Sequence, residues 1–226
     1  VGSEMCIRDS LSTIVLSVFV TLASLFVGGL SGLFLERHRF WGRDAIVGLI
    51  TLPLSFPGVV VGFMIIMLGG RNGLIGMFTQ GLGAGKLVFA YGMAGLFLGY
   101  LYFSIPRVVT TVMAAAKKID PMYEEAARTL GASSFRILKD VTLPALAPAL
   151  FSTGALCFAT SMGAFGTAFT LATDINVLPI TIYTEFTLSA NIASAAMLSV
   201  VLGLITWIML IAARHFSGSS TVTGAA

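Results

Sequence analysis

The chain has 226 residues, of which 57% are hydrophobic and only 10% are charged, and its formal net charge is +3. Its mean hydropathy is +0.96, whereas an ordinary soluble domain carries about 25% charged residues. A soluble globule of this size could not bury so much apolar surface, so the composition excludes one and indicates that a lipid bilayer surrounds most of the chain. The two cysteines, Cys6 and Cys157, indicate neither a disulfide framework nor a metal cluster.

The first ten residues, VGSEMCIRDS, do not match the rest of the chain. They lack the basic and apolar regions of a secretory signal. We interpret residues 1–10 as a non-native-looking leader and leave them out of the fold prediction.

Five apolar stretches follow, each long enough to cross about 30 Å of hydrocarbon as a helix. They run from about 11–35, 45–68, 87–113, 144–171 and 192–213. Pro53 and Pro57 are expected to kink or break the early part of the second stretch. The stretches are continuous, whereas barrel strands would alternate apolar and polar residues. The sequence therefore predicts an all-α polytopic transmembrane helical bundle, followed by a disordered tail at 217–226.

Basic residues in the short loops predict the orientation. Only Arg71 and Lys86 lie between spans on one side, together with the acids Asp174 and Glu185 of the last loop. Arg107 is expected to snorkel toward the other side from the end of the third span. The side with more lysines and arginines is predicted to be cytoplasmic. Its basic residues are Arg37, Arg39, Arg43, Lys117, Lys118, Arg128, Arg136, Lys139 and Arg214.

Glycines recur every three or four positions on one face of the third span, at Gly92, Gly95 and Gly99. Such stripes let helix backbones approach closely in lipid. Helix packing is the first interpretation, and contact with a transported molecule is the alternative.

A polar segment, residues 114–143, separates the third and fourth spans. Asp120 is placed to cap a first helix, and Pro121 suits its first position because the missing N–H is not needed there. Gly131 can end this helix with a positive φ angle. The spacing predicts a capped helix at about 121–130.

A second short helix is predicted to start at a cap formed by Ser133 or Ser134 and to run to about Asp140. Pro144 would then restart the chain as the fourth span. Two capped helices in one loop are unusual for a mere connection between spans, so this hairpin is expected to need a partner in water.

The hairpin carries a specific pattern: Glu125-Ala126-Ala127, three residues, Gly131, nine residues, and Val141-x-Leu143-Pro144. It resembles the signature of inner-membrane permease subunits of binding-protein-dependent ABC importers, which reads E-A-A, three residues, G, nine residues, Ile or similar, one residue, L-P. Val141 is the one tolerated departure. The resemblance extends over about 11–216, which it assigns to one importer transmembrane domain.

The resemblance implies that the hairpin is a coupling helix that docks on a separate ATP-binding subunit. The residues that it assigns to the ATPase contact are Glu124, Glu125, Ala126, Ala127, Arg128, Leu130 and Gly131. Those that it assigns to the structure of the coupling loop are Asp120, Pro121, Leu143 and Pro144.

The implied partners are two ABC ATPase subunits, a second permease that is identical or homologous, a solute-binding protein and the lipid bilayer, with no nucleic acid. ATP and Mg²⁺ would be bound by the ATPase and no cofactor by this chain, because the segment 81–86 (GLGAGK) lacks the spacing and the Ser or Thr of a phosphate loop. The implied location is a bacterial inner membrane, crossed several times. The family also implies a further span before the first, which predicts that the N-terminus is clipped.

The region GAFGTAFTLATDINVLPITIYTEFT resembles the polyamine and ferric-iron subgroup, chiefly in VLPI followed by IY at positions 177–183. It predicts a spermidine/putrescine-type solute, with ferric iron or another small solute as the alternative. The candidate pathway groups are Tyr100, Ser161, Thr167, Asp174 and Glu185. For the two acids in this set, the competing interpretation is a solvated charge in a loop.

Two other classes remain as alternatives. A secondary transporter or channel would carry intramembrane ionisable groups or inverted repeats, and an intramembrane enzyme would carry a Ser/His pair, paired Asp residues or an H-E-x-x-H helix. We find neither set in the spans. His38 and His215 sit beside arginines at the ends of apolar stretches, as interfacial residues do. No catalytic or metal-binding residue is predicted.

Overall fold

The structure is a computed structural model that describes residues 2–81, 85–171 and 177–216. In these ranges the regular structure is entirely helical. In chain order the elements are α1 (Gly2–Arg37), α2 (Arg43–Thr51), η1 (Leu52–Ser55), α3 (Gly58–Gly69), α4 (Leu74–Gly81), α5 (Met93–Ala116), α6 (Pro121–Thr129), α7 (Ser134–Ile137), η2 (Leu138–Thr142), α8 (Leu143–Met162), α9 (Phe165–Leu171), α10 (Leu178–Thr187) and α11 (Ile192–Phe216).

Five helical stretches within the described residues are long and apolar enough to cross a membrane. The predicted all-α, polytopic membrane fold is therefore confirmed. The five stretches are Ile7–Arg37, Gly58–Gly81, Met93–Ala116, Ser134–Met162 and Ile192–His215.

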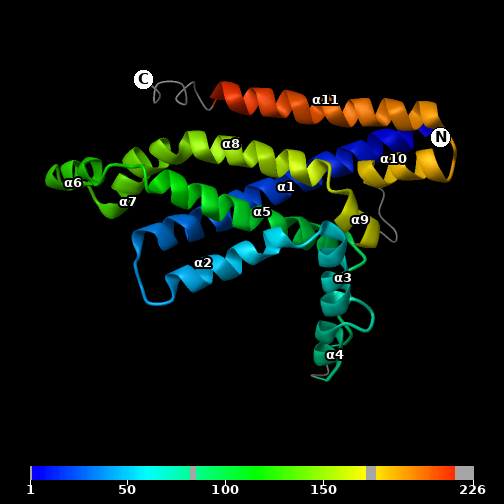
Figure 1. Cartoon of the computed structure of the whole chain (residues 1–226), viewed down its shortest axis with the longest axis horizontal. Coiled ribbons are helices and arrows are strands. Elements are labelled where there is room, and N and C mark those ends of the chain that lie inside the picture. Colours follow the sequence, from blue (N-terminus) through cyan, green and yellow to red (C-terminus); the bar gives the residue numbers. More distant parts are fainter. Residues whose placement is uncertain (1, 82–84, 172–176, 217–226) are drawn as a thin grey trace.

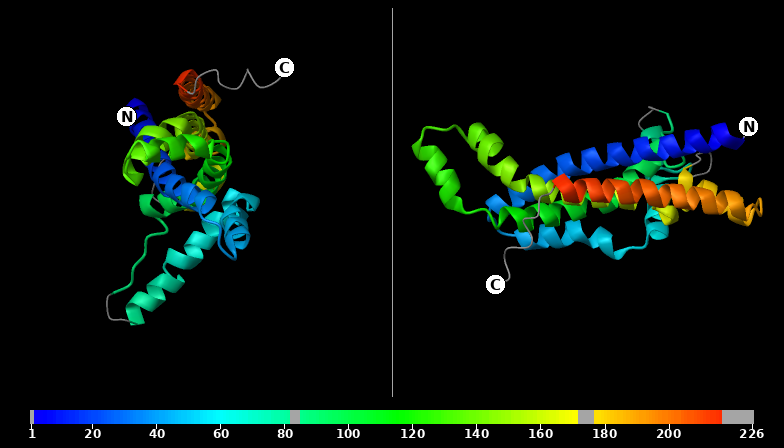
Figure 2. Two further views of the ribbon diagram at one scale, coloured as in Figure 1. Left: turned by 90° about the vertical axis from the view of Figure 1, so that its left-hand side faces the viewer. Right: turned by 90° about the horizontal axis from the view of Figure 1, so that it is seen from above.

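The long helices α1, α5 and α8 pack against one another, and α11 lies outside them against α8 and α10. The short helices α6 and α7 project beyond one end of this bundle, which we call the hairpin end (Figure 1). The turn between α1 and α2 and the last turn of α11 lie at the same end, whereas α9, α10 and the N-terminus lie at the opposite end (Figures 1 and 2).

A close backbone approach joins α1 to α5. A Cβ atom built on Gly28 would lie 2.8 Å from Val108 Cβ, and one built on Gly32 would lie 2.8 Å from the carbonyl oxygen of Val109. Real Cβ atoms do not approach so closely, so only glycine fits at these two positions. Around this contact Val108 and Val112 form a core with Leu146 and Cys157 of α8.

The predicted second span, 45–68, is wrong in its course. Residues 43–55 form α2 and η1, the helix ends at Phe56, and a new helix starts after Pro57 in a different direction (Figure 1). Phe56 is extended, with φ −93° and ψ 137°, because the proline ring that follows disfavours the α conformation. The expected break at Pro57 is confirmed, but the apolar stretch that follows covers 58–81 as two helices, α3 and α4.

The third and fourth spans also differ from their predicted limits. Residues 87–92 precede α5 and are not helical, because the N–H groups of Phe89 and Ala90 donate to the carbonyl oxygen of Gly69 at the end of α3. The fourth helix ends at Met162, and α9 turns away after a break at 163–164 (Figure 1).

The hairpin and the fourth span are joined differently from the prediction. The sequence predicts a stop near Asp140 and a restart at Pro144, whereas α7, η2 and α8 form one continuous helix over 134–162. The segment η2 is a π turn directly before the proline. Its wider backbone removes the collision that a proline ring makes with the preceding turn of an α-helix.

Two further segments were not predicted as part of the bundle. Residues 178–187 form α10, where a loop was expected, and Glu185 lies in this helix. Residues 2–10, set aside as a leader, continue α1. In that segment Asp9 is buried and accepts a hydrogen bond from the hydroxyl of Thr181 at 3.0 Å. The predicted disordered tail lies outside the described residues.

Candidate functional site

The first candidate site is the hairpin formed by α6, α7 and η2. The carboxylate of Asp120 accepts a hydrogen bond of 2.9 Å from the N–H of Met122, which caps α6, and Pro121 occupies the first turn. Gly131 has φ +79° and reverses the chain, and the hydroxyl of Ser133 accepts from the N–H of Arg136 at the start of α7. Local capping therefore shapes the hairpin without much packing from the bundle.

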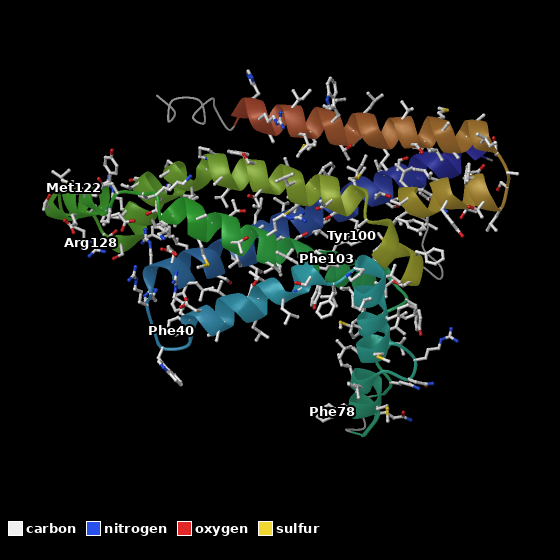
Figure 3. All side chains as sticks on the ribbon, in the orientation of Figure 1. Phe40, Phe78, Tyr100, Phe103, Met122 and Arg128 are labelled. Atoms are coloured by element: carbon white, nitrogen blue, oxygen red, sulfur yellow. The ribbon has the colours of Figure 1, made fainter. Side chains whose placement is uncertain are left out.

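Four large apolar side chains are exposed on the hairpin, beside the charged residues in which the segment is rich. Leu130 is 87% exposed and Phe135 is 75% exposed. Met122 and Tyr123 are exposed beside them, and Met122 lies at the outer tip of the molecule (Figure 3). We call these four residues the hairpin patch. Exposed apolar side chains with charged neighbours mark a surface that binds another protein.

Between α6 and the helix that follows lies a small groove of about 230 Å³. Ala127 and Leu130 form one wall. On the other wall, Arg136 and Asp140 pair at 3.5 Å across one helical turn. Of the residues predicted to contact the ATPase, Ala127 and Leu130 line this groove, and Leu130 also belongs to the hairpin patch. The lining is Ala127, Leu130, Ala132, Arg136, Ile137, Asp140 and Val141.

A polar cluster that the sequence did not reveal ties the hairpin to the bundle. The guanidinium of Arg37, the last residue of α1, pairs with the carboxylate of Glu124 and donates to the Thr142 hydroxyl at 2.8 Å. That hydroxyl donates in turn to Glu124 at 3.1 Å. Thr142 is fully buried in the π turn, so this cluster joins α1, α6 and η2.

The two adjacent acids of α6 therefore have different surroundings. The carboxylate of Glu124 is engaged inside the chain, whereas Glu125 is exposed. No hydrogen bond or ion pair of the Glu125 side chain is found within the described part of the chain. Of the two, Glu125 is the acid available to another protein.

Arg37→Ala is expected to loosen the hairpin without unfolding the bundle. Hydrogen bonds to charged groups contribute about 1.5–3 kcal/mol, and solvent screening of this partly exposed pair lowers the expected contribution to about 1–2 kcal/mol, so amide hydrogen exchange in α6 should accelerate by roughly 5- to 30-fold. Arg128→Ala is the matched control because Arg128 is exposed on the same helix. Equal exchange in the two variants would show that the cluster does not hold the hairpin.

A second candidate site lies in the middle of the bundle, where α3, α5, α8 and α9 meet around a cavity of about 250 Å³. The labelled side chains of Tyr100 and Phe103 mark its place in Figure 3. Three of the predicted pathway groups, Tyr100, Ser161 and Thr167, line this cavity. The structure therefore brings together residues that lie more than sixty positions apart in the sequence.

The predicted acidic group that the structure describes, Glu185, does not join this cavity. Glu185 is half-buried in α10 and is not among the lining residues, and Asp174 lies outside the described residues. Instead, the cavity holds Arg107, whose guanidinium donates to Thr160 Oγ1 at 2.9 Å. The prediction that Arg107 snorkels to the end of its span is wrong, because Thr160 holds it across the helix pair. A charged residue nine positions before the end of α5 was the signal that could have revealed it.

The sequence is similar to those of known transport proteins. A family model described as the binding-protein-dependent transport system inner membrane component matches residues 11–219. The molybdenum transport system permease ModB of Haemophilus influenzae is 36% identical over 183 residues, which cover 78% of this chain and 77% of ModB. The sulfate transport system permease CysT of Salmonella typhimurium is 37% identical over 164 residues, which cover 69% of this chain and 58% of CysT. The putative 2-aminoethylphosphonate transport system permease PhnU of Salmonella typhi is 29% identical over 223 residues, which cover 95% of this chain and 77% of PhnU.

Solved structures show the same fold. A bacterial ABC transporter for import of alginate has a chain with a TM-score of 0.81 at 18% identity, covering 96% of this chain and 79% of its own length. The MetNI methionine ABC transporter has one with a TM-score of 0.73 at 17% identity, covering 95% of both chains. The fold is that of an ABC transporter permease.

This chain belongs to the family of inner-membrane components of binding-protein-dependent transport systems. It is a multi-pass inner-membrane protein and a transport subunit, as the sequence predicted. The relatives named above carry molybdenum, sulfate and 2-aminoethylphosphonate permease names. These relatives do not support the predicted spermidine/putrescine-type solute.

Proposed function

We propose that residues 11–216 form half of the membrane pathway of an ATP-driven importer for a small oxyanion, delivered by a solute-binding protein. The hairpin carries the first part of this proposal. It has an exposed apolar patch, a free acid at Glu125 and a rigid connection into the bundle, which is what a docking element that transmits force requires. The second permease is a further copy of this chain or a homologue.

In this proposal the hairpin inserts into a surface groove of an ABC ATPase, one for each permease. Ala126 and Ala127 allow close approach, Leu130 and the rest of the hairpin patch bury apolar surface, and Glu125 meets a basic group of the ATPase. ATP and Mg²⁺ are bound by that ATPase. This chain supplies the docking contact and the helix that transmits the movement into the bundle.

The continuous helix 134–162 transmits movement from the hairpin to the bundle, and we call it the lever. Because α7, η2 and α8 have no break between them, a displacement of the hairpin moves the far end of α8, where Thr160 and Ser161 line the cavity. The Arg37–Glu124–Thr142 cluster adds a second connection, from the hairpin to α1. The hairpin end carries basic residues that the sequence assigns to the cytoplasmic side. In the proposed orientation this end therefore faces the cytoplasm.

The oxyanion part rests on two independent supports. Three relatives named above carry permease names for sulfate, molybdenum or a phosphonate. The central cavity also has the matching charge, since Arg107 lines it and no acidic residue does among the described residues. A polyamine carries several positive charges and would be repelled there.

Uptake by the assembled complex tests this function. The chain is produced with its ATPase, second permease and binding protein and reconstituted in proteoliposomes containing ATP. Labelled molybdate and sulfate should accumulate in an ATP-dependent manner, whereas labelled spermidine and ferric chelate should not. Spermidine uptake without oxyanion uptake would contradict the proposed solute and leave the importer mechanism intact.

A further inference from the structure

We propose that the central cavity is a transient binding site for a tetrahedral oxyanion inside the permease, with Arg107 as its cationic group and Ser161 as a neutral hydrogen-bond donor. This inference rests on the proposed function, because it assigns a contact point to the proposed cargo. The cavity of about 250 Å³ greatly exceeds the roughly 30 Å³ share of one water molecule. It therefore admits a small anion with part of its hydration.

Arg107 supplies the charge. It is nine residues before the end of α5 at Ala116, about 14 Å along the helix axis, and is therefore well inside the span. A charge at that depth is costly against lipid and is found facing a hydrated cavity or a partner group. Across the described ranges no carboxylate lies within ion-pair distance of Arg107, so its guanidinium remains available for an anion.

The neighbouring hydroxyl orients this guanidinium. Thr160 Oγ1 accepts from Arg107 at 2.9 Å and donates to the carbonyl oxygen of Leu156 at 2.8 Å. Thr160 thus holds one N–H group of Arg107. The Cys157 thiol lies beside the same guanidinium. The remaining N–H groups of the planar guanidinium can donate to two oxygens of an oxyanion.

Ser161 supplies a neutral donor next to the charge. Its side chain is only 3% exposed and lines the cavity, and no hydrogen bond of its hydroxyl is found in the part of the chain that the structure describes. The fully enclosed hydroxyls without a partner among the described residues are those of Ser17 and Ser24, whereas the Ser161 hydroxyl opens onto the cavity and can donate to water or a ligand there. The other predicted pathway groups are already engaged, because Tyr100 donates to Ala164 O at 3.1 Å and Thr167 donates to Gly58 O at 3.1 Å.

The position of the two groups couples the site to the lever. Arg107 is on α5, whereas Ser161 is on α8, the helix that continues without a break from the hairpin. A movement of the hairpin therefore changes the distance between the cation and the hydroxyl. The site would bind the anion in one conformation and release it in the other.

Initial rates of molybdate and sulfate uptake by the reconstituted complex test the site. Arg107→Gln is expected to lower the rate roughly tenfold or more, since a charge-assisted pair is lost. Arg107→Lys should retain most of it because the charge remains. Arg214→Gln, which removes an exposed arginine at the end of α11, should behave as wild type. If Arg107 only tied α5 to α8, the Gln and Lys variants would be impaired alike, and Thr160→Val would be impaired equally.

Thiol labelling gives a readout that does not depend on transport. In a chain whose two cysteines are replaced by alanine, Ser161→Cys should react faster with an anionic than with a cationic thiosulfonate, and molybdate should slow the reaction. Adding Arg107→Gln should remove that preference. Normal uptake by Arg107→Gln with unselective labelling would overturn the site and leave the importer function standing. A wild-type complex that carries neither oxyanion would overturn both.

Discussion

Glu125→Arg is expected to reduce ATP-driven uptake by at least about 100-fold while the chain still inserts and folds. Glu125 is exposed on α6, and glutamate and arginine have similar helix propensities, so the hairpin itself should tolerate the change. In the docked complex the reversed charge would face the basic group that the acid normally meets. Like charges in a desolvated contact cost several kcal/mol, which is enough to prevent docking.

A charge reversal outside the hairpin distinguishes a loss of docking from a general effect of the added positive charge. Asp44 lies at the start of α2 with a side chain that is 99% exposed, and Asp44→Arg should leave uptake within about twofold of wild type. Co-purification of the ATPase and binding-protein-stimulated ATP hydrolysis should both be lost in Glu125→Arg only. A Glu125→Arg complex that retains its ATPase and transports normally would remove the coupling role of this residue.

Gly32→Leu is expected to cause a large loss of stability in the bundle. A Cβ at this position lies 2.8 Å from a backbone oxygen of α5, which no side-chain rotation can move. Gly32→Ala should therefore cost about 1–3 kcal/mol. Leucine adds three more carbon atoms to the same contact, so the cost should exceed about 3 kcal/mol and separate α1 from α5.

The matched control lies in the same helix. A Cβ on Gly29 has only Leu150 Cδ2 near it, at 3.9 Å, so Gly29→Ala should be neutral or stabilising by up to about 1 kcal/mol because glycine weakens a helix. Thermal unfolding of the purified chain in detergent measures the difference. Similar melting temperatures for Gly29→Ala and Gly32→Ala would show that α1 and α5 do not pack through this contact.

The sequence was informative wherever a local rule applies over a few residues. Long apolar stretches predicted membrane helices, and the ends of α6 follow from Asp120, Pro121 and Gly131, whose capping chemistry depends only on neighbours in the chain. Pro57 predicted a break for the same reason, since its ring restricts the residue before it.

The sequence was uninformative wherever direction and pairing depend on distant residues. Hydropathy could not show that the chain leaves the bundle axis at Phe56, because apolar residues continue on both sides of the break. The predicted glycine stripe includes one close helix contact, at Gly99, where an added Cβ would lie 2.6 Å from Thr167 of α9, but the sequence did not single out Gly28 and Gly32. Which glycine face meets another helix is decided by the partner helix.

The cluster of Arg37, Glu124 and Thr142 shows the same limit in the hairpin. Its members are 18 to 105 residues apart in the chain, so no spacing rule connects them. The π turn that directs Thr142 toward the other two is likewise set by the helix continuing through Pro144. The difference between Glu124 and Glu125 therefore emerged only in three dimensions.

By itself the sequence determined that this protein lies in a lipid bilayer, that it is helical and that it belongs to the permease family. It also determined the capped hairpin that carries the family's signature. These follow from composition and from short-range chemistry, which act within a few residues. The tertiary structure alone decided which acid of the hairpin is free, where the second apolar helix runs and that Arg107 shares a cavity with Ser161. Those outcomes depend on packing between helices, and packing joins residues that the order of the chain keeps apart.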